Sequence, residues 1–203
     1  MWLFAHAGIP TGLVWLCNKA TACGKPDMAS QRQYPGGARQ PNDHVTALAG
    51  IFSQVDYRLL MLGTLLPDII DKPLGAWILG GTLSNTRIFT HTLLFVLLLA
   101  IVGICLYLIT GRQGGLWLSF GCLTHLCLDQ MWLNPRTLLW PIYGWSFERM
   151  NLNNWLENGI SSLATNQRLY VPEIIGAIIL ALFFIDVLRQ GKLYSFLKTG
   201  KVA

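Results

Sequence analysis

Charged residues are scarce in this chain of 203 residues. Only 12 % of the residues are Asp, Glu, Lys or Arg, whereas 53 % are hydrophobic, and the mean hydropathy is +0.45. Soluble globular domains usually carry about 25 % charged residues. The shortage of charge excludes an ordinary soluble protein. It predicts an all-α, polytopic membrane protein with a single membrane-embedded domain, residues 1–203.

The patterns that bind nucleic acid or hold disulfides are also missing. The net charge of +5 comes from Lys and Arg scattered between apolar runs, without a basic stripe interleaved with aromatic residues. The five cysteines form no C-x-x-C pair, and Cys105, Cys122 and Cys127 lie in apolar runs, where a thiol behaves as a small hydrophobic group. We therefore expect no nucleic-acid partner, no disulfide framework and no zinc site built from cysteines.

Five apolar segments predict about five membrane helices. The clearest, residues 93–110, contains no charge and matches the ~20 residues that a helix needs to cross ~30 Å of hydrocarbon. The next, residues 174–188, is interrupted only by Asp186. The first two segments along the chain are weaker, because one is short and the other contains Asp56 and Arg58, so each is interpreted as a full span or as a partial or tilted one. In chain order, the five segments are residues 2–17, 45–67, 93–110, 116–133 and 174–188.

Two long polar segments connect the apolar ones. Residues 18–44 are rich in Gly, Pro, Gln, Asn and Asp, which predicts a flexible loop. Residues 134–171 carry Trp140, Trp145 and Trp155, together with the apolar patch LLWPIYGW. Tryptophan and tyrosine are enriched where a membrane meets water, so we interpret this segment as an interfacial connection.

Positive charges beside the spans predict the orientation. Lys and Arg favour the cytoplasmic side, so the loop 18–44 and the basic tail 189–203 are both expected in the cytoplasm. With five spans, the turn 111–115 lies on that side too, and the remaining span ends face the outside. The charges that carry this prediction are Lys19, Lys25, Arg32, Arg39, Arg112, Arg189, Lys192, Lys198 and Lys201.

His125 and Asp129 form a polar pair inside the apolar run GCLTHLCLDQMWL, residues 121–133. Residues four apart lie on one face of a helix, so an imidazole nitrogen and a carboxylate oxygen can point to one place. Zinc and similar ions accept both ligand types at ~2.0–2.2 Å. The same spacing suits a plain hydrogen bond. An ionisable group at membrane depth costs roughly 2.5–3.5 kcal/mol, which favours a function for Asp129.

Three further segments place His or Asp next to the ends of predicted spans. In MLGTLLPDIIDKP, Asp68 and Asp71 follow an apolar run and either serve a site or form a turn at the membrane surface. In NTRIFTHTLLF, His91 opens the clearest span, as a ligand or as an interface residue. In MWLFAHAGIPTG, His6 precedes Gly8, which allows close approach of an ion or of a packed helix.

These groups are all expected at the extracytoplasmic face, and three of the four histidines in the chain share that level. A His and Asp cluster without thiolates fits a catalytic or dinuclear metal site better than a structural one, which cysteines usually close. We therefore predict a bound divalent metal, with zinc as the leading candidate.

The succession HAG, LLPDIID, FTHTLLF, THLCLDQMW and LLWP resembles the YdjM-type family of membrane-bound metal-dependent hydrolases. That family is grouped by fold with zinc-dependent phospholipase C and with zinc single-strand nucleases. The similarity runs from residue 1 to about residue 147, apart from residues 18–44. The resemblance implies that the metal ligands are His6, Asp68, His91, His125 and Asp129.

The chain departs from the family pattern in two places. Many members read Pro-Asp-Ile-Asp-His where this chain reads Pro-Asp-Ile-Ile-Asp-Lys, so a histidine is missing and Asp71 is shifted. The soluble members of the superfamily use further His and Glu ligands, and no histidine follows residue 147 here. A complete trinuclear cluster is therefore not expected.

The expected chemistry is metal-dependent hydrolysis of a phosphodiester or other ester, with membrane lipid head groups as the accessible substrates. The ion would supply an activated water. Asp71, Glu148 or Glu157 is expected to act as general base, and Arg87 to hold a phosphate. The protein is expected in a bacterial or archaeal cytoplasmic membrane, and its sequence indicates no oligomeric state.

Two other functions fit the same residues. A non-catalytic scaffold or an ion-conducting protein would use the His and Asp cluster to join helices or to guide an ion. A regulatory anchor would bind a cytoplasmic partner through the loop 18–44 and the basic tail, although neither segment contains a recognition motif.

Overall fold

The computed structural model describes residues 3–23, 50 and 54–202, and that part of the chain is helical without strands, which confirms the all-α prediction. Short 3-10 and π-helical turns accompany the α-helices. The elements are α1 (Leu3–Cys23), α3 (Tyr57–Pro73), η2 (Leu74–Ile78), α4 (Leu93–Thr110), α5 (Gly114–Leu128), η3 (Met131–Leu133), α6 (Pro135–Leu138), α7 (Trp155–Thr165), α8 (Gln167–Arg189) and α9 (Leu193–Thr199).

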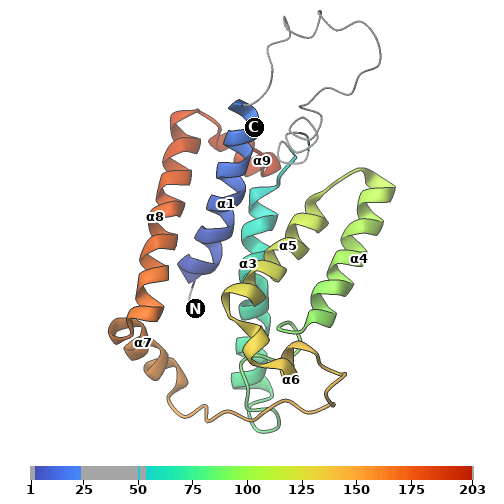
Figure 1. Cartoon of the computed structure of the whole chain (residues 1–203), viewed down its shortest axis with the longest axis vertical. Coiled ribbons are helices and arrows are strands. Elements are labelled where there is room, and N and C mark those ends of the chain that lie inside the picture. The colour runs from blue at the N-terminus through green and yellow to red at the C-terminus, as the bar shows by residue number, and fades with distance from the viewer. Residues whose placement is uncertain (1–2, 24–49, 51–53, 203) are drawn as a thin grey trace, which may run out of the picture.

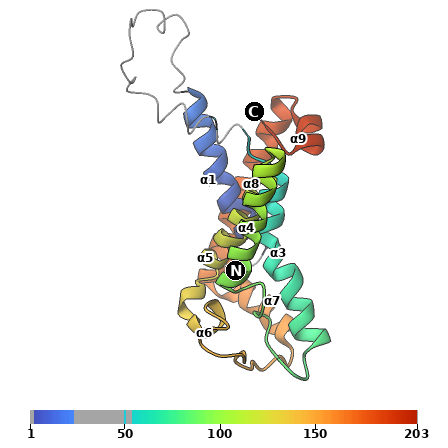
Figure 2. The ribbon, with the colours of Figure 1, turned by 90° about the vertical axis from the view of Figure 1, so that its right-hand side faces the viewer.

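Five long helices stand side by side in the order α8, α1, α3, α5, α4, with each helix packed against the next (Figure 1). The view turned by 90° shows the array from its side, where it is narrower than in Figure 1 (Figure 2). The order places α8 and α4 at the two edges and α1, α3 and α5 between them. The inner three helices therefore have neighbours on both sides, and they carry most of the polar groups described below.

Among the described residues, only α4 and α8 are long and apolar enough to cross a membrane, so the prediction of about five spans is not supported. Most side chains of these two helices are not buried in the protein, as expected for helices that face lipid. The other three long helices, α1, α3 and α5, lack the length or the hydropathy of a span. With 17 and 15 residues, α3 and α5 are shorter than the ~20 residues of a typical span, and α1 includes the polar residues Asn18 and Lys19.

The predicted bounds of the clearest span are confirmed by α4. The hydroxyl of Thr92 accepts the amide of Phe95 at 3.1 Å and starts the helix, and Gly111 ends it with a left-handed φ of 69°. The segment 116–133 is not one helix, because α5 ends at Leu128 and Gln130 takes a left-handed φ of 52°. Asp129 consequently stands at the end of α5 and not within a span.

The predicted loop and tail are partly helical. The first helix continues through Cys23, into the segment predicted as a loop, and residues 24–44 lie outside the described residues. In the tail, α9 folds back so that Phe196 and Val202 are buried with Tyr57 and Phe183 in a hydrophobic cluster. In the connection 134–171, the side chain of Trp145 is 79 % exposed, which agrees with an interfacial position.

Two pairs of glycines bring neighbouring helices into backbone contact. A Cβ atom at Gly121 of α5 would lie 2.5 Å from the carbonyl oxygen of Leu60 in α3, and one at Gly63 would lie 2.2 Å from the carbonyl oxygen of Leu118. Gly8 and Gly176 meet in the same way between α1 and α8. Such small-residue contacts are typical of membrane helix pairs.

Candidate metal centre

All five predicted metal ligands come together near one end of the array. His6 lies on α1, Asp68 on α3, His91 in the turn before α4, His125 on α5, and Asp129 directly after it. Their ring nitrogens and carboxylate oxygens form two overlapping groups, each with its ligand atoms within 4.8 Å of one another. One group is His6, His125 and Asp129, and the other is Asp68, His91 and His125, so this cluster could hold a metal ion.

The distances within the cluster suit shared ligation. The Nε2 atoms of His91 and His125 lie 3.2 Å apart, and Oδ1 of Asp68 lies 3.6 Å from His91 Nε2 and 3.9 Å from His125 Nε2. Across the cluster, His6 Nε2 lies 3.1 Å from Asp129 Oδ1. Two ligand atoms of a tetrahedral zinc, each ~2.0–2.1 Å from the metal, are about 3.3 Å apart. The observed spacings are close to that value.

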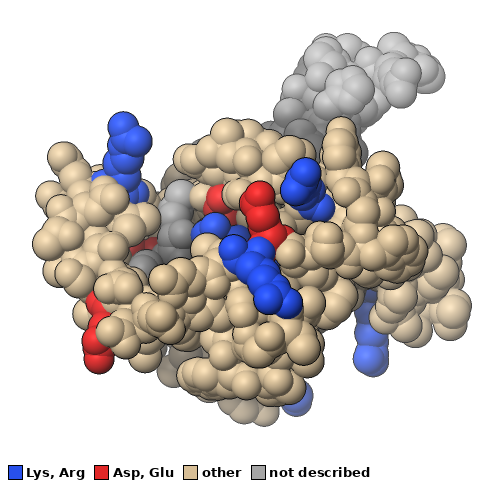
Figure 3. Space-filling model, turned by 90° about the horizontal axis from the view of Figure 1, so that it is seen from below, with Lys and Arg blue, Asp and Glu red and all other residues tan. Residues whose placement is uncertain are grey.

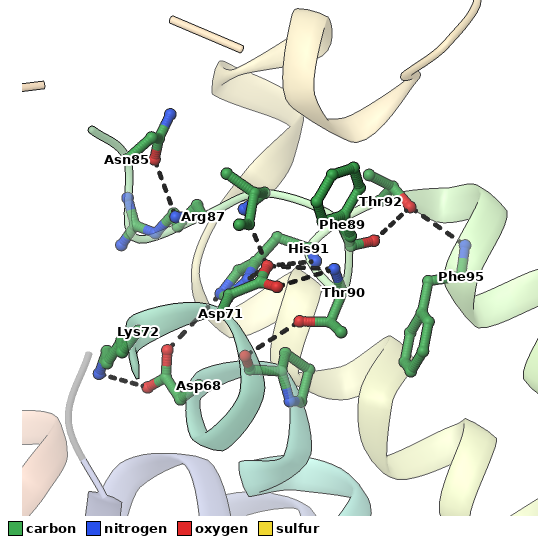
Figure 4. A network of polar contacts seen from close by, with 12 residues as sticks. Asp68, Asp71, Lys72, Asn85, Arg87, Phe89, Thr90, His91, Thr92 and Phe95 are labelled. Carbon is green, nitrogen blue, oxygen red and sulfur yellow. Dashed lines mark hydrogen bonds and ion pairs between the residues drawn. The ribbon is translucent and has the colours of Figure 1, made fainter. Parts of the chain in front are cut away.

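Asp71 holds His91 and the turn before α4 (Figure 4). Its carboxylate is fully buried, and Oδ2 accepts the amides of Ile88 at 2.8 Å, Thr90 at 3.1 Å and His91 at 3.2 Å. The same oxygen lies 2.8 Å from Nδ1 of His91. A carboxylate in this position accepts the Nδ1 proton, which leaves the Nε2 lone pair facing the cluster.

His125 is oriented by the backbone of α3. Its Nδ1 atom lies 2.7 Å from the carbonyl oxygen of Thr64, to which it donates its proton. This contact requires α3 and α5 to approach closely, and the contact between Gly63 and Gly121 allows it. His125 therefore offers Nε2 alone to the cluster.

Charges around the cluster keep its carboxylates ionised. Burial opposes the charged form of Asp129, but hydrogen bonding from His6 and the nearby charge of Arg87 lower the pKa of this carboxyl far below its usual range. Burial also favours the neutral ring of His91, but hydrogen bonds to Asp68 and Asp71 outweigh it and raise the pKa of His91 above its usual value. The negative charge that stabilises a proton on His91 would equally attract a cation.

Arg87 and Lys72 link the cluster to the surface. Arg87 contacts Oδ2 of Asp129 through Nε at 2.9 Å and Nη2 at 2.8 Å, and its side chain is 36 % exposed. Lys72 binds Oδ2 of Asp68 at 2.6 Å, while Oδ1 of Asp68 faces the imidazoles. Seen from below, this end of the molecule shows basic and acidic side chains gathered near its middle, within a mainly uncharged face (Figure 3).

The predicted general bases lie in three different settings. Asp71 is buried behind His91, as described above. Glu148 is exposed and lines a cavity of about 110 Å³ together with Arg87 and Asn85, and its backbone carbonyl accepts the Asn85 amide at 2.7 Å. Glu157 is exposed on α7 and does not line that cavity.

Sequence reasoning missed Glu173. This residue of α8 is 8 % exposed, and its carboxylate accepts the amides of Phe4 at 2.8 Å and Ala5 at 3.3 Å. It therefore holds the first turn of α1, which carries His6. The available signal was an acidic residue next to a long apolar run, since such a group persists mainly where it has a partner.

Comparison with known proteins identifies the family. No curated protein and no solved structure matches the chain. The model of the YdjM inner membrane protein family matches residues 36–193, and so extends past residue 147, where the resemblance was expected to end. The matched range contains Asp68, Asp71, His91, His125 and Asp129, whereas His6 precedes it. Because this range covers most of the chain, the protein belongs to the YdjM inner membrane protein family.

Proposed function

We propose that this protein is a membrane-bound, metal-dependent hydrolase of phosphodiesters or related esters, with lipid head groups as its substrates. The observation that carries the proposal is the convergence of three imidazoles and two carboxylates into two overlapping groups that share His125, with His91 Nε2 and His125 Nε2 3.2 Å apart. These donors come from four separate parts of the chain, so their meeting is a property of the whole fold.

The donor set fits zinc. Neutral imidazole nitrogens and carboxylate oxygens are its usual non-sulfur ligands, and open catalytic sites commonly combine them. His125 can complete only one of the two overlapping groups, because its Nδ1 atom is engaged by the Thr64 carbonyl. We therefore propose one ion per chain, held by His125 with His91 and Asp68 or with His6 and Asp129. When bound, a divalent ion lowers the pKa of its water from about 15.7 towards about 7 and polarises a phosphoryl oxygen.

Asp71 is better suited to positioning than to proton transfer. Its accepting oxygen already contacts three backbone amides and His91, and the side chain is fully buried. The general base we favour is Glu148, because this exposed residue lines the same cavity as Arg87. Arg87 bridges this cavity and Asp129, so its guanidinium can hold a substrate phosphate next to the cluster.

Exposed aromatic side chains support a membrane-surface setting for the site. Trp77 is 72 % exposed in η2, which follows α3, and Trp132 is 58 % exposed in η3, which follows α5. Trp145, in the connection to α7, is 79 % exposed. Aromatic residues of this kind settle at the level of lipid head groups. We propose that α4 and α8 cross the membrane in the same direction and that α5 returns the chain between them, so that the cluster faces the extracytoplasmic side and the basic tail lies in the cytoplasm.

Metal content and turnover test the function. We expect the detergent-purified protein to contain about one zinc per chain by elemental analysis, and to hydrolyse bis(p-nitrophenyl) phosphate. His125→Ala should lose both properties, and so should Asp129→Ala where the ion lies with His6, or Asp68→Ala where it lies with His91. Asp186→Ala, which removes a carboxylate of α8 outside the cluster, should keep both. A folded wild-type protein that takes up no metal would instead favour the scaffold, in which the pairs of Asp129 with His6 and Arg87 join helices.

Single-cysteine labelling tests the orientation. In a background without the native cysteines, Met150→Cys should react with an impermeant maleimide added outside, and His44→Cys should react only after the membrane is opened. Reaction of Met150→Cys from the cytoplasm alone would invert the proposed topology.

A further inference from the structure

A second cavity, lined by several charged residues, lies at the other end of the array, where α3 begins. Its volume is about 530 Å³, and the start of α3, the turn between α4 and α5, and the end of α9 form its walls. Its charged lining residues are Asp56, Arg58, Arg112, Lys198 and Lys201. None of them belongs to the candidate metal centre, so this cavity needs an explanation of its own.

The charge of this cavity is strongly positive. Four of its lining side chains are cationic, and the single acid, Asp56, is already engaged. Asp56 caps α3 by accepting the amides of Arg58 and Leu59, and it pairs with the Arg58 guanidinium at 3.1 Å. Lys201 contacts the neutral amide of Gln54, and Lys198 lies over the ring of Tyr194, so neither contact cancels a charge. Arg112 adds a third cation beside them.

The N-terminus of α5 faces the same cavity, whereas the first amides of α3 are already accepted by Asp56 and by the Gly200 carbonyl. Leu59 in the first turn of α3 and Gln113 and Gly114 at the start of α5 line the cavity. Helix N-termini carry partial positive charge and amide donors, which favour phosphate groups. At the end of α9, the Gly200 carbonyl accepts the amide of Tyr57 at 2.9 Å and the Leu197 carbonyl accepts Arg58 Nη1 at 2.7 Å, so these two acceptors are already engaged.

We propose that this cavity binds the phosphate group of an anionic ligand, either the head group of an anionic membrane lipid or free inorganic phosphate. The apolar end of α4 lies next to it: Leu108 is 76 % and Ile109 80 % exposed, directly before the turn that contains Arg112. A lipid could place its acyl chain along this surface and its phosphate among the cations. Basic pockets at cytoplasmic helix ends commonly hold anionic head groups.

Binding to the full-length protein in a neutral detergent tests the proposal. Dioleoylphosphatidylglycerol and dioleoylphosphatidylcholine share acyl chains and differ in charge, so their affinities can be compared by native mass spectrometry. Inorganic phosphate is titrated separately by calorimetry. The cavity variant combines Arg112→Gln, Lys198→Gln and Lys201→Gln. The matched control combines Arg136→Gln, Arg168→Gln and Arg189→Gln, which removes the same charge from exposed positions outside the cavity.

We expect the wild type to prefer phosphatidylglycerol at least about tenfold, since each Lys or Arg near an anionic head group contributes on the order of 1 kcal/mol. The cavity variant should lose this preference, and the control should keep it within about twofold. Binding of inorganic phosphate that is lost only in the cavity variant, without any preference between the lipids, would assign the site to free phosphate. Equal losses in both triple variants, or no loss in the cavity variant, would overturn the proposal. If the triple variant does not fold, Arg112→Gln and Lys198→Gln alone should each weaken binding about threefold.

Discussion

Nδ1 of His91 lies 2.8 Å from Oδ2 of Asp71, and both side chains are fully buried. The two residues are separated by 20 positions in the chain, and the turn before α4 wraps around the carboxylate through three backbone amides. A carboxylate behind a histidine orients the ring and raises its basicity as a ligand. The conformation of this turn therefore affects the orientation and basicity of His91, and with them the metal affinity of the candidate centre.

Where the ion is held by His91 and Asp68, Asp71→Asn is expected to weaken metal binding about 10–100-fold without removing any proposed ligand, because the amide no longer provides a charged acceptor for His91. Competition with a chromophoric chelator measures the affinity. Asp186→Asn is the control, since it changes a carboxylate on α8, outside the cluster. Unchanged affinity in Asp71→Asn would contradict a role of His91 as a ligand and would assign the ion to the group with His6 and Asp129.

Removing the metal should lower the melting temperature of the wild-type protein. A ligand that binds only the folded state stabilises it by about 2.7 kcal/mol at a free concentration 100 times its Kd. We expect chelation to lower the melting temperature and zinc to restore it, as followed by intrinsic fluorescence. His125→Ala should melt at the same temperature with and without chelator. If the chelator also leaves the melting temperature of the wild-type protein unchanged, the metal does not stabilise the fold.

Gly121→Ala should destabilise the protein and reduce metal binding together. The added Cβ would lie 2.5 Å from the Leu60 carbonyl oxygen, so α3 and α5 must separate, at a cost of roughly 1–3 kcal/mol. The same movement would strain the hydrogen bond between His125 and the Thr64 carbonyl. Thermal unfolding and chelator competition measure the two effects. Gly81→Ala is the control, because a Cβ there meets no atom within 4 Å.

Glu173→Gln should lower stability by about 1–3 kcal/mol, because an amide replaces a buried charged acceptor of the Phe4 and Ala5 amides. The first turn of α1 would loosen, and metal affinity should fall where the ion is held by His6 and Asp129, because His6 lies in that turn. Glu157→Gln changes an exposed glutamate of α7 and should leave both properties unchanged. If Glu173→Gln lowers stability but leaves metal affinity intact, His6 is not a ligand.

The sequence carried enough information for the membrane class, the helical fold, the bounds of α4 and the five clustered His and Asp residues. These features are local or compositional. A run of 18 apolar residues needs a helix to satisfy its backbone in lipid, and a threonine and a glycine mark its ends. His and Asp stand out in such surroundings because burying them without partners is costly.

The tertiary structure decided how many helices have the length of a span, where α5 ends, and what each polar residue contacts. The sequence predicts Asp71 as a candidate general base. Only the packed turn before α4 shows that its Oδ2 atom already accepts three backbone amides. Glu173 reaches the amide of Phe4 across 169 positions, a separation over which no sequence spacing is informative. Local propensity cannot specify such contacts, because they depend on the order and the closeness with which separate helices pack.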